Sequence, residues 1–148
     1  MTTNINSGAP ALAMDSCDRI RARLASLLVH LDQHPELADT VSVHDVRSQL
    51  AIQIFPWSRG GDSHLGVLAE WQRTLGLCQP VKVTAVTNKG AVHLEMDGVL
   101  CDGSPIRLFV LPSEREITLL GDHVVVEEGA MFPADLVQRL AATSVGGA

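Results

Sequence analysis

The sequence predicts an α+β fold, with about six or seven mainly antiparallel strands and three helices packed on one face of the sheet. Two early segments, 15–34 and 63–75, place apolar residues at the spacing of an amphipathic helix, and a third follows near the C-terminus. Between them, residues 81–110 alternate apolar and polar side chains and are interrupted by strong turn sequences, as expected of neighbouring strands.

The composition is that of a globular domain with an aliphatic core, because hydrophobic residues make up 46% of the chain and aromatic residues only 3%. A length of 148 residues predicts one domain over 15–142, with flexible tails at 1–14 and 143–148. So few aromatic rings disfavour single-stranded nucleic acid as a partner, since its bases need rings to stack on. A net charge of −6 also disfavours duplex nucleic acid and anionic membranes.

The cysteine pattern indicates a reducing compartment. Cys17, Cys78 and Cys101 are an odd number without C-x-x-C spacing, which is typical of free thiols and not of a disulfide framework. No apolar run reaches the length of a membrane span, and the N-terminus lacks the positive and long apolar regions of a signal peptide. We therefore expect a cytoplasmic protein, with no metal and no cofactor.

The first half of the chain predicts a helix and a pair of strands. Asp15 or Ser16 can cap a helix that ends at His34, because the residue before a proline avoids the helical conformation. Valines and isoleucines then alternate with polar residues, which predicts an antiparallel pair at about 41–46 and 48–55, joined tightly around Arg47.

The second half predicts a helix and three clear strands. Asp62 or Ser63 caps the helix and Gly76 ends it. Strands follow at 81–86, 92–100 and 106–110, with hairpin turns at Asn88-Lys89-Gly90 and Asp102-Gly103-Ser104-Pro105.

The C-terminal part predicts further strands and a last helix. A turn at 112–115 leads to a strand containing Ile117 and Leu119, a second strand follows at 124–126, and a helix covers 133–142. The valine-rich strand 124–126 and the open sheet edges favour pairing with a second copy, so we expect a homodimer.

A weak internal repeat is also visible. A shift of forty positions superimposes the apolar residues of 27–52 on those of 67–92, which suggests a degenerate helix–strand–strand duplication. The alternative is that any two such units align when they are placed in phase.

The loop 58–64 is a candidate site for an anionic ligand. A glycine-containing loop that enters a helix offers free N–H groups to an anion. The residues that would form this site are Arg59, Gly60, Gly61, Ser63 and His64. The loop lacks the P-loop and dinucleotide-binding patterns, and Asp62 would repel a phosphate. The alternative is an ordinary loop whose Asp caps the helix.

Two groups of side chains offer weaker hints of chemistry. Cys101 could form a nucleophilic pair with His93, although no nucleophile motif surrounds it. His93, Glu95 and Asp97 share one strand face and could serve acid–base catalysis, but such a trio is more often the solvated side of an antiparallel sheet.

A helical histidine pair and an aromatic loop complete the candidates. His30 and His34 share one helix face, as in helical metal sites, but the Glu of the H-E-x-x-H pattern is missing and a helix C-terminus favours histidines anyway. Phe55 and Trp57 lie in or beside a Pro–Gly loop and could anchor a protein partner, because Trp is enriched at binding hot spots. The alternative is that both rings fold back over the edge of the core.

Two short motifs resemble known proteins. The sequences E-W-x-x-T-L-G at 70–76 and V-L-C-D-G-S-P-I-R-L-F at 99–109 are similar to those of small uncharacterised α/β proteins common in actinobacteria and their mobile elements. The resemblance covers roughly 15–111. It implies an architecture but no site, because the group carries no established activity.

Three function classes therefore stay open. We rank first a non-enzymatic protein-interaction module, such as a regulator, adaptor or chaperone, that binds another protein and itself. A small-ligand or anion-binding protein that uses the loop 58–64 comes second. A small enzyme that uses His93 and Glu95, or Cys101, comes third, and it needs these groups to converge in a pocket.

Overall fold

The computed structural model describes residues 15–56 and 63–146, with side chains up to Thr143. In these ranges the elements are α2 (Ser16–Gln33), the 3-10 helix η1 (Pro35–Thr40), β1 (Val41–Asp45), β2 (Ala51–Ile54), α3 (His64–Thr74), β3 (Val81–Val86), β4 (Val92–Val99), β5 (Pro105–Val110), α4 (Glu114–Gly121), β6 (Met131–Phe132) and α5 (Ala134–Gly146).

The described strands form one six-stranded sheet in the order β1-β2-β5-β4-β3-β6. Every pairing is antiparallel except that of β2 with β5, which is parallel. The predicted α+β fold with a mainly antiparallel sheet is thus confirmed. The parallel pair arises because β5 inserts between the two hairpins, so that β2 and β4 are not neighbours.

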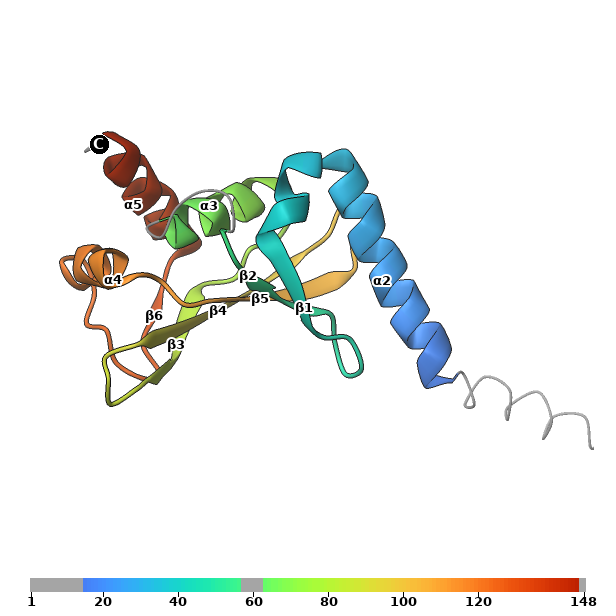
Figure 1. Cartoon of the computed structure of the whole chain (residues 1–148), viewed down its shortest axis with the longest axis horizontal. Coiled ribbons are helices and arrows are strands. Elements are labelled where there is room, and N and C mark those ends of the chain that lie inside the picture. The colour runs from blue at the N-terminus through green and yellow to red at the C-terminus, as the bar shows by residue number, and fades with distance from the viewer. Residues whose placement is uncertain (1–14, 57–62, 147–148) are drawn as a thin grey trace, which may run out of the picture.

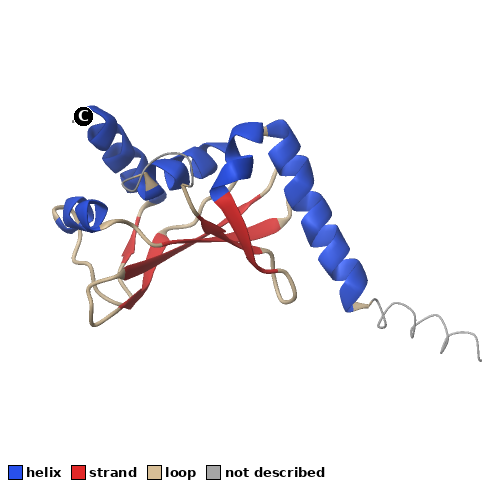
Figure 2. Ribbon diagram, in the orientation of Figure 1, coloured by secondary structure: helices blue, strands red, loops and turns tan. Residues whose placement is uncertain are grey.

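Helices α3, α4 and α5 lie on one side of the sheet in Figures 1 and 2, and α2 runs from that side down past the end of the sheet. Strand β4 shows why this side is the core: Val92, Leu94 and Met96 are buried, while the alternating His93, Glu95 and Asp97 are only partly covered. Helix α3 supplies the fully buried Trp71 to the core. This arrangement is favoured because each Å² of apolar surface that is removed from water contributes about 25 cal/mol to the free energy of folding.

Several local predictions are confirmed. The Asp15 carboxylate accepts the backbone N–H groups of Cys17 and Asp18 and so caps α2. Gly90, in the β3–β4 turn, has a φ of +84°, and Gly103, in the β4–β5 turn, a φ of +86°. Both turns need the left-handed conformation that glycine adopts without strain.

The predicted strand around Ile117 and Leu119 is wrong, because both residues lie in α4. The Ser113 side chain accepts the N–H of Glu116, and the Glu116 carboxylate accepts the N–H of Ser113. This capping box starts a helix where the alternation of apolar residues indicated a strand. The described part of the chain consequently has four α-helices and not three.

The predicted strand at 124–126 is also absent. These valines lie in the segment between α4 and β6, and the edge of the sheet beside β3 is occupied by Met131 and Phe132 of β6. The last helix begins near the expected residue but continues to Gly146 instead of ending at residue 142. Within the described residues, no helix has both the length and the apolarity needed to cross a bilayer.

The proposed repeat has partial support in the element order, since helix–strand–strand occurs as α2-β1-β2 and as α3-β3-β4. Both hairpins have a bulge at equivalent positions, after Val43 and after Val83. Their registers differ, because Val43 pairs with Ile52 whereas Val83 pairs with Leu94, two residues beyond the forty-residue shift. The duplication stays a prediction.

Candidate functional site

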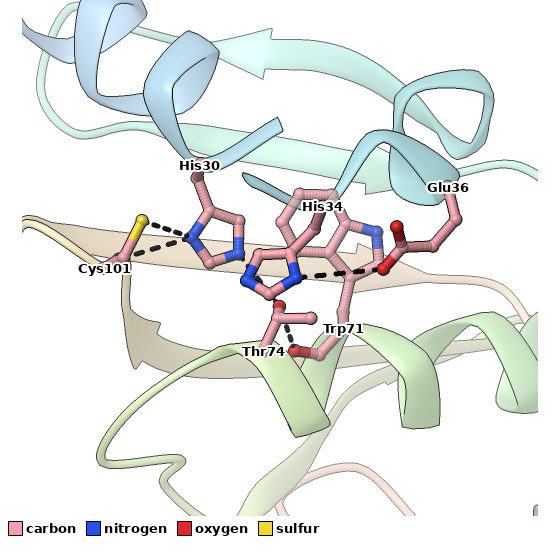
Figure 3. Close-up of polar contacts among 6 residues, drawn as sticks. All are labelled: His30, His34, Glu36, Trp71, Thr74 and Cys101. Atoms are coloured by element: carbon pink, nitrogen blue, oxygen red, sulfur yellow. Dashed lines mark hydrogen bonds and ion pairs between the residues drawn. The ribbon is translucent and has the colours of Figure 1, made fainter. Parts of the chain in front are cut away.

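His30 is a fully buried polar side chain near the C-terminal end of α2. Its ring stacks on the indole of Trp71 in α3, with ring centroids 5.6 Å apart and planes inclined by 10°. Figure 3 shows that the imidazole lies between Cys101 on one side and Thr74 on the other. A buried histidine needs partners for both ring nitrogens, and this one has them.

The hydrogen bonds around His30 fix which nitrogen carries the proton. Thr74 donates its only hydroxyl hydrogen to the carbonyl of Trp71, at 2.8 Å. Its Oγ1, which is 2.8 Å from His30 Nε2, must therefore accept a hydrogen from that nitrogen. In a neutral imidazole the other nitrogen, Nδ1, is then an acceptor.

Cys101 supplies the hydrogens that face this acceptor. Its Sγ lies 3.2 Å from His30 Nδ1, and its backbone N–H also donates to Nδ1 at 3.2 Å. Cys101 sits in the turn after β4 and is an exposed residue, so its thiol lies against a buried, oriented base at the surface of the protein. This is the arrangement of a thiol whose proton can be removed by a histidine.

The surroundings of His30 favour its neutral form. Burial lowers the pKa of His30, and the neighbouring His34, whose ring centroid is 4.8 Å away, lowers it further. The carboxylates of Asp102 and Glu36 act in the opposite direction and would stabilise a positive charge on the ring. At neutral pH the imidazole is therefore uncharged, and the lone pair of Nδ1 is directed at the S–H and N–H groups of Cys101.

The backbone around β4 brings Thr74 close to Cys101. Gly76, just after α3, exchanges two hydrogen bonds of 2.9 Å with Val99, at the end of β4. The approach is close enough that a Cβ at Gly98 would lie 3.2 Å from the Leu75 side chain. A glycine at position 98 thus permits the contact that holds the end of α3 beside the Cys101 turn.

The structure pairs Cys101 with His30 and not with His93. These partners are 71 residues apart, so no local spacing signals their contact. His93, Glu95 and Asp97 lie on the other, partly covered face of β4. There Arg107 binds both carboxylates, with Nε 2.8 Å from Glu95 and 2.7 Å from Asp97. The trio thus contributes carboxylates to an ion-pair cluster on the sheet surface.

The predicted anion site falls only partly within the described residues, since Arg59, Gly60 and Gly61 lie outside them. Ser63 is the N-cap residue of α3, but its side chain makes no capping hydrogen bond. Glu116 supplies the cap instead: its Oε2 accepts the N–H of Leu65 at 2.6 Å, and its Oε1 lies 3.3 Å from His64 Nδ1. A buried carboxylate already occupies the helix start, and it would repel a second anion.

The predicted partner-binding pair is also only partly described. Phe55 follows β2, is half-buried and donates its backbone N–H to Thr40 at 2.7 Å, while Trp57 lies outside the described residues. For metals, the described residues contain no cluster of three or more His, Cys, Asp or Glu side chains arranged as ligands. Both nitrogens of His30 are in addition engaged by Cys101 and Thr74.

Comparison with known proteins gives no match among family models, curated proteins or solved structures. Function is therefore inferred from the geometry of this chain alone.

Proposed function

We propose that this chain is a non-enzymatic protein-interaction module that acts as a homodimer, with the sheet edge at β1 as its interface. The observation that carries the proposal is the position of β1. It is one of the two outermost strands of the sheet, the other being the two-residue strand β6, and Ser42, Val43 and His44 are exposed along it. Val43, an apolar β-branched residue, keeps 46% of its surface exposed.

The backbone of β1 offers hydrogen-bonding groups to a neighbour. The backbone N–H of Phe55 donates to the carbonyl of Thr40, just before β1. Along an antiparallel pair, residues whose N–H and C=O groups face the partner strand alternate with residues whose groups point away from it. The register places Ser42 opposite Gln53, so the N–H and C=O of Ser42 face β2, whereas those of Val41 and Val43 point outward. An unpaired edge of this kind is a template for another strand.

The sequence of β1 does little to protect that edge. Natural edge strands are commonly blocked by Lys, Pro or bulges. The strand V-S-V-H-D contains neither Lys nor Pro, and its one bulge lies after Val43, which leaves Val41 to Val43 regular. Two copies related by a twofold axis would pair these segments and join their sheets. An extended peptide of another protein could use the same edge by strand addition.

The test is the solution mass of the full chain, measured by light scattering over a concentration series. We expect a dimer, and we expect the Val43→Lys variant to be monomeric, because a lysine on the edge opposes pairing. The control is Val125→Lys, which changes a valine that is 71% exposed, against 46% for Val43, and that lies outside any strand. This variant should remain dimeric. A monomeric wild type, or a Val43→Lys variant that dimerises like the wild type, contradicts the proposal.

A further inference from the structure

We infer that Cys101 is a reactive thiol that exchanges with small disulfides, with His30 as the base that removes its proton. The inference is independent of the proposed dimer. It rests on three features of the geometry: the exposed position of Cys101, the 3.2 Å contact between Sγ and Nδ1, and the hydrogen-bond chain that orients the imidazole.

The orientation of His30 matters because a free imidazole interconverts between two tautomers. Thr74 accepts the hydrogen of Nε2 and cannot donate to it, since its own hydrogen is bound to the Trp71 carbonyl. Stacking on Trp71 also restricts rotation of the ring. Nδ1 is thereby held as the acceptor that faces Cys101, and Thr74 acts as a positioning residue.

The reaction balances without any further oxidant. The sulfur of Cys101 attacks one sulfur of a low-molecular-weight disulfide R–S–S–R, while its proton passes to His30 Nδ1. A bond forms between Cys101 Sγ and one R–S group, the S–S bond of the reagent breaks, and R–S⁻ leaves; the proton on Nδ1 then passes to that thiolate if it is basic, or to water if it is not. The products are a mixed disulfide at Cys101 and one equivalent of the leaving group, as the thiol R–SH or, for an acidic thiol, as the thiolate R–S⁻ with one proton released.

The transient imidazolium is stabilised by groups already in place. Its Nε2–H is bound by Thr74 Oγ1, and the negative charges of Asp102 and Glu36 favour a positive charge on the ring. His34 opposes them, since a positive charge on it would repel a charged His30. Residues 101–103 of this turn are exposed, so a small disulfide approaches Cys101 from solvent without passing through the core.

The chain contains its own comparison thiol. Cys17 is also exposed, on α2, but the structure gives its thiol no histidine partner among the described residues. Cys78 differs from both, because it is half-buried, donates to the Gln72 carbonyl and has a pKa raised by burial. If exposure alone set the reactivity, Cys101 and Cys17 would react at equal rates. If His30 assists, Cys101 reacts faster than Cys17.

The experiment uses the full chain with a single thiol left, as C17S/C78S, which keeps Cys101, or C78S/C101S, which keeps Cys17. The probe is the aromatic disulfide 5,5′-dithiobis(2-nitrobenzoic acid), whose released thiolate is followed by absorbance at a series of pH values. We expect Cys101 to react at least about tenfold faster than Cys17 near pH 6.5. We expect the ratio of the Cys101 rate to the Cys17 rate to increase as the pH is lowered.

Variants of the orienting chain complete the test in the background that keeps Cys101. Thr74→Val removes the acceptor for Nε2–H and should abolish most of the rate advantage, whereas Thr74→Ser keeps a hydroxyl and should retain it. In the His30→Gln variant the rate of Cys101 should show the same pH profile as that of Cys17. If this substitution of a buried residue prevents folding, the comparison of Thr74→Val with Thr74→Ser tests the inference instead. Equal rates and pH slopes for Cys101 and Cys17, or a folded Thr74→Val protein that reacts like its parent, would overturn the inference.

Discussion

At the scale of single residues, His30 connects three parts of the fold. From α2 it reaches the turn after β4 through Cys101 and the end of α3 through Thr74, and it stacks on Trp71. Each hydrogen bond of this kind makes a net contribution of about 1 kcal/mol to the stability of the fold. Leaving one of the buried polar groups without a partner lowers the stability by more than that. The protonation of His30 is therefore coupled to the stability of the whole core.

Acidification should destabilise the protein through this residue. A histidine in an unfolded chain has a pKa of about 6.5, and burial lowers the pKa of His30 in the folded protein. As pH falls below 6.5 the unfolded state takes up the proton first, so the free energy of unfolding decreases until the folded-state pKa is reached. The slope contributed by His30 is at most about 1.4 kcal/mol per pH unit.

Urea unfolding between about pH 7.5 and pH 5 measures this slope. His30→Gln should lower the stability at neutral pH but make its pH dependence shallower. The control, His123→Gln, changes an exposed histidine after α4 and should leave the slope as in the wild type. Identical slopes in all three proteins would show that His30 does not control the acid response.

At the scale of elements, one carboxylate starts two helices. Glu116 is 3% exposed; its Oε1 accepts the N–H of Ser113 in the capping box of α4, and its Oε2 accepts the N–H of Leu65 in the first turn of α3. A negative charge at a helix N-terminus is favourable. Glu116 thus joins α4 to α3, which explains why Ser63 is not needed as a side-chain cap.

Removing the charge of Glu116 should loosen both helix starts. Glu116→Gln keeps the shape but replaces one acceptor oxygen by an NH₂ group that faces a backbone N–H, so we expect a loss of about 2 kcal/mol in the free energy of unfolding. Thermal or urea unfolding measures it. Glu114→Gln, an exposed acid in the same first turn, should change stability by less than about 0.5 kcal/mol. Equal losses in the two variants would contradict the double-capping role.

At the scale of the whole molecule, the sheet has two different faces and an open edge. One face packs against the helices, and the other carries the Arg107, Glu95 and Asp97 cluster. The chain has a net charge of −6, so two copies repel each other at long range. The proposed interface at β1 must overcome this repulsion through strand pairing.

Salt should therefore strengthen the proposed dimer. Raising the ionic strength from about 0.01 M to about 0.15 M shortens the Debye length from about 30 Å to about 8 Å and screens the repulsion. We expect the dissociation constant, measured by sedimentation equilibrium, to decrease with added NaCl. A dissociation constant that rises with salt would indicate attraction between opposite charges across the interface and would contradict pairing driven by the uncharged segment 41–43.

The sequence by itself determined the local structure wherever the signal was local. The Asp15 cap, the Gly90 and Gly103 turns and the alternation along β4 depend on residues within a few positions of one another, and all are confirmed. Helix α4 could also be predicted from the sequence, since Ser113-x-x-Glu116 is a capping-box pattern. Its alternating Ile117 and Leu119 fitted a strand equally well, and short apolar runs fit both structures.

Only the tertiary structure decided the strand order and the candidate site. The insertion of β5 between β2 and β4, and the meeting of His30, Thr74 and Cys101, join segments that are far apart in the chain. Such contacts depend on how whole elements pack around a shared core. This packing produces no recognisable pattern in the sequence near any of the residues that meet. Local patterns specify which elements form, while the burial of their apolar faces against one another sets which side chains meet.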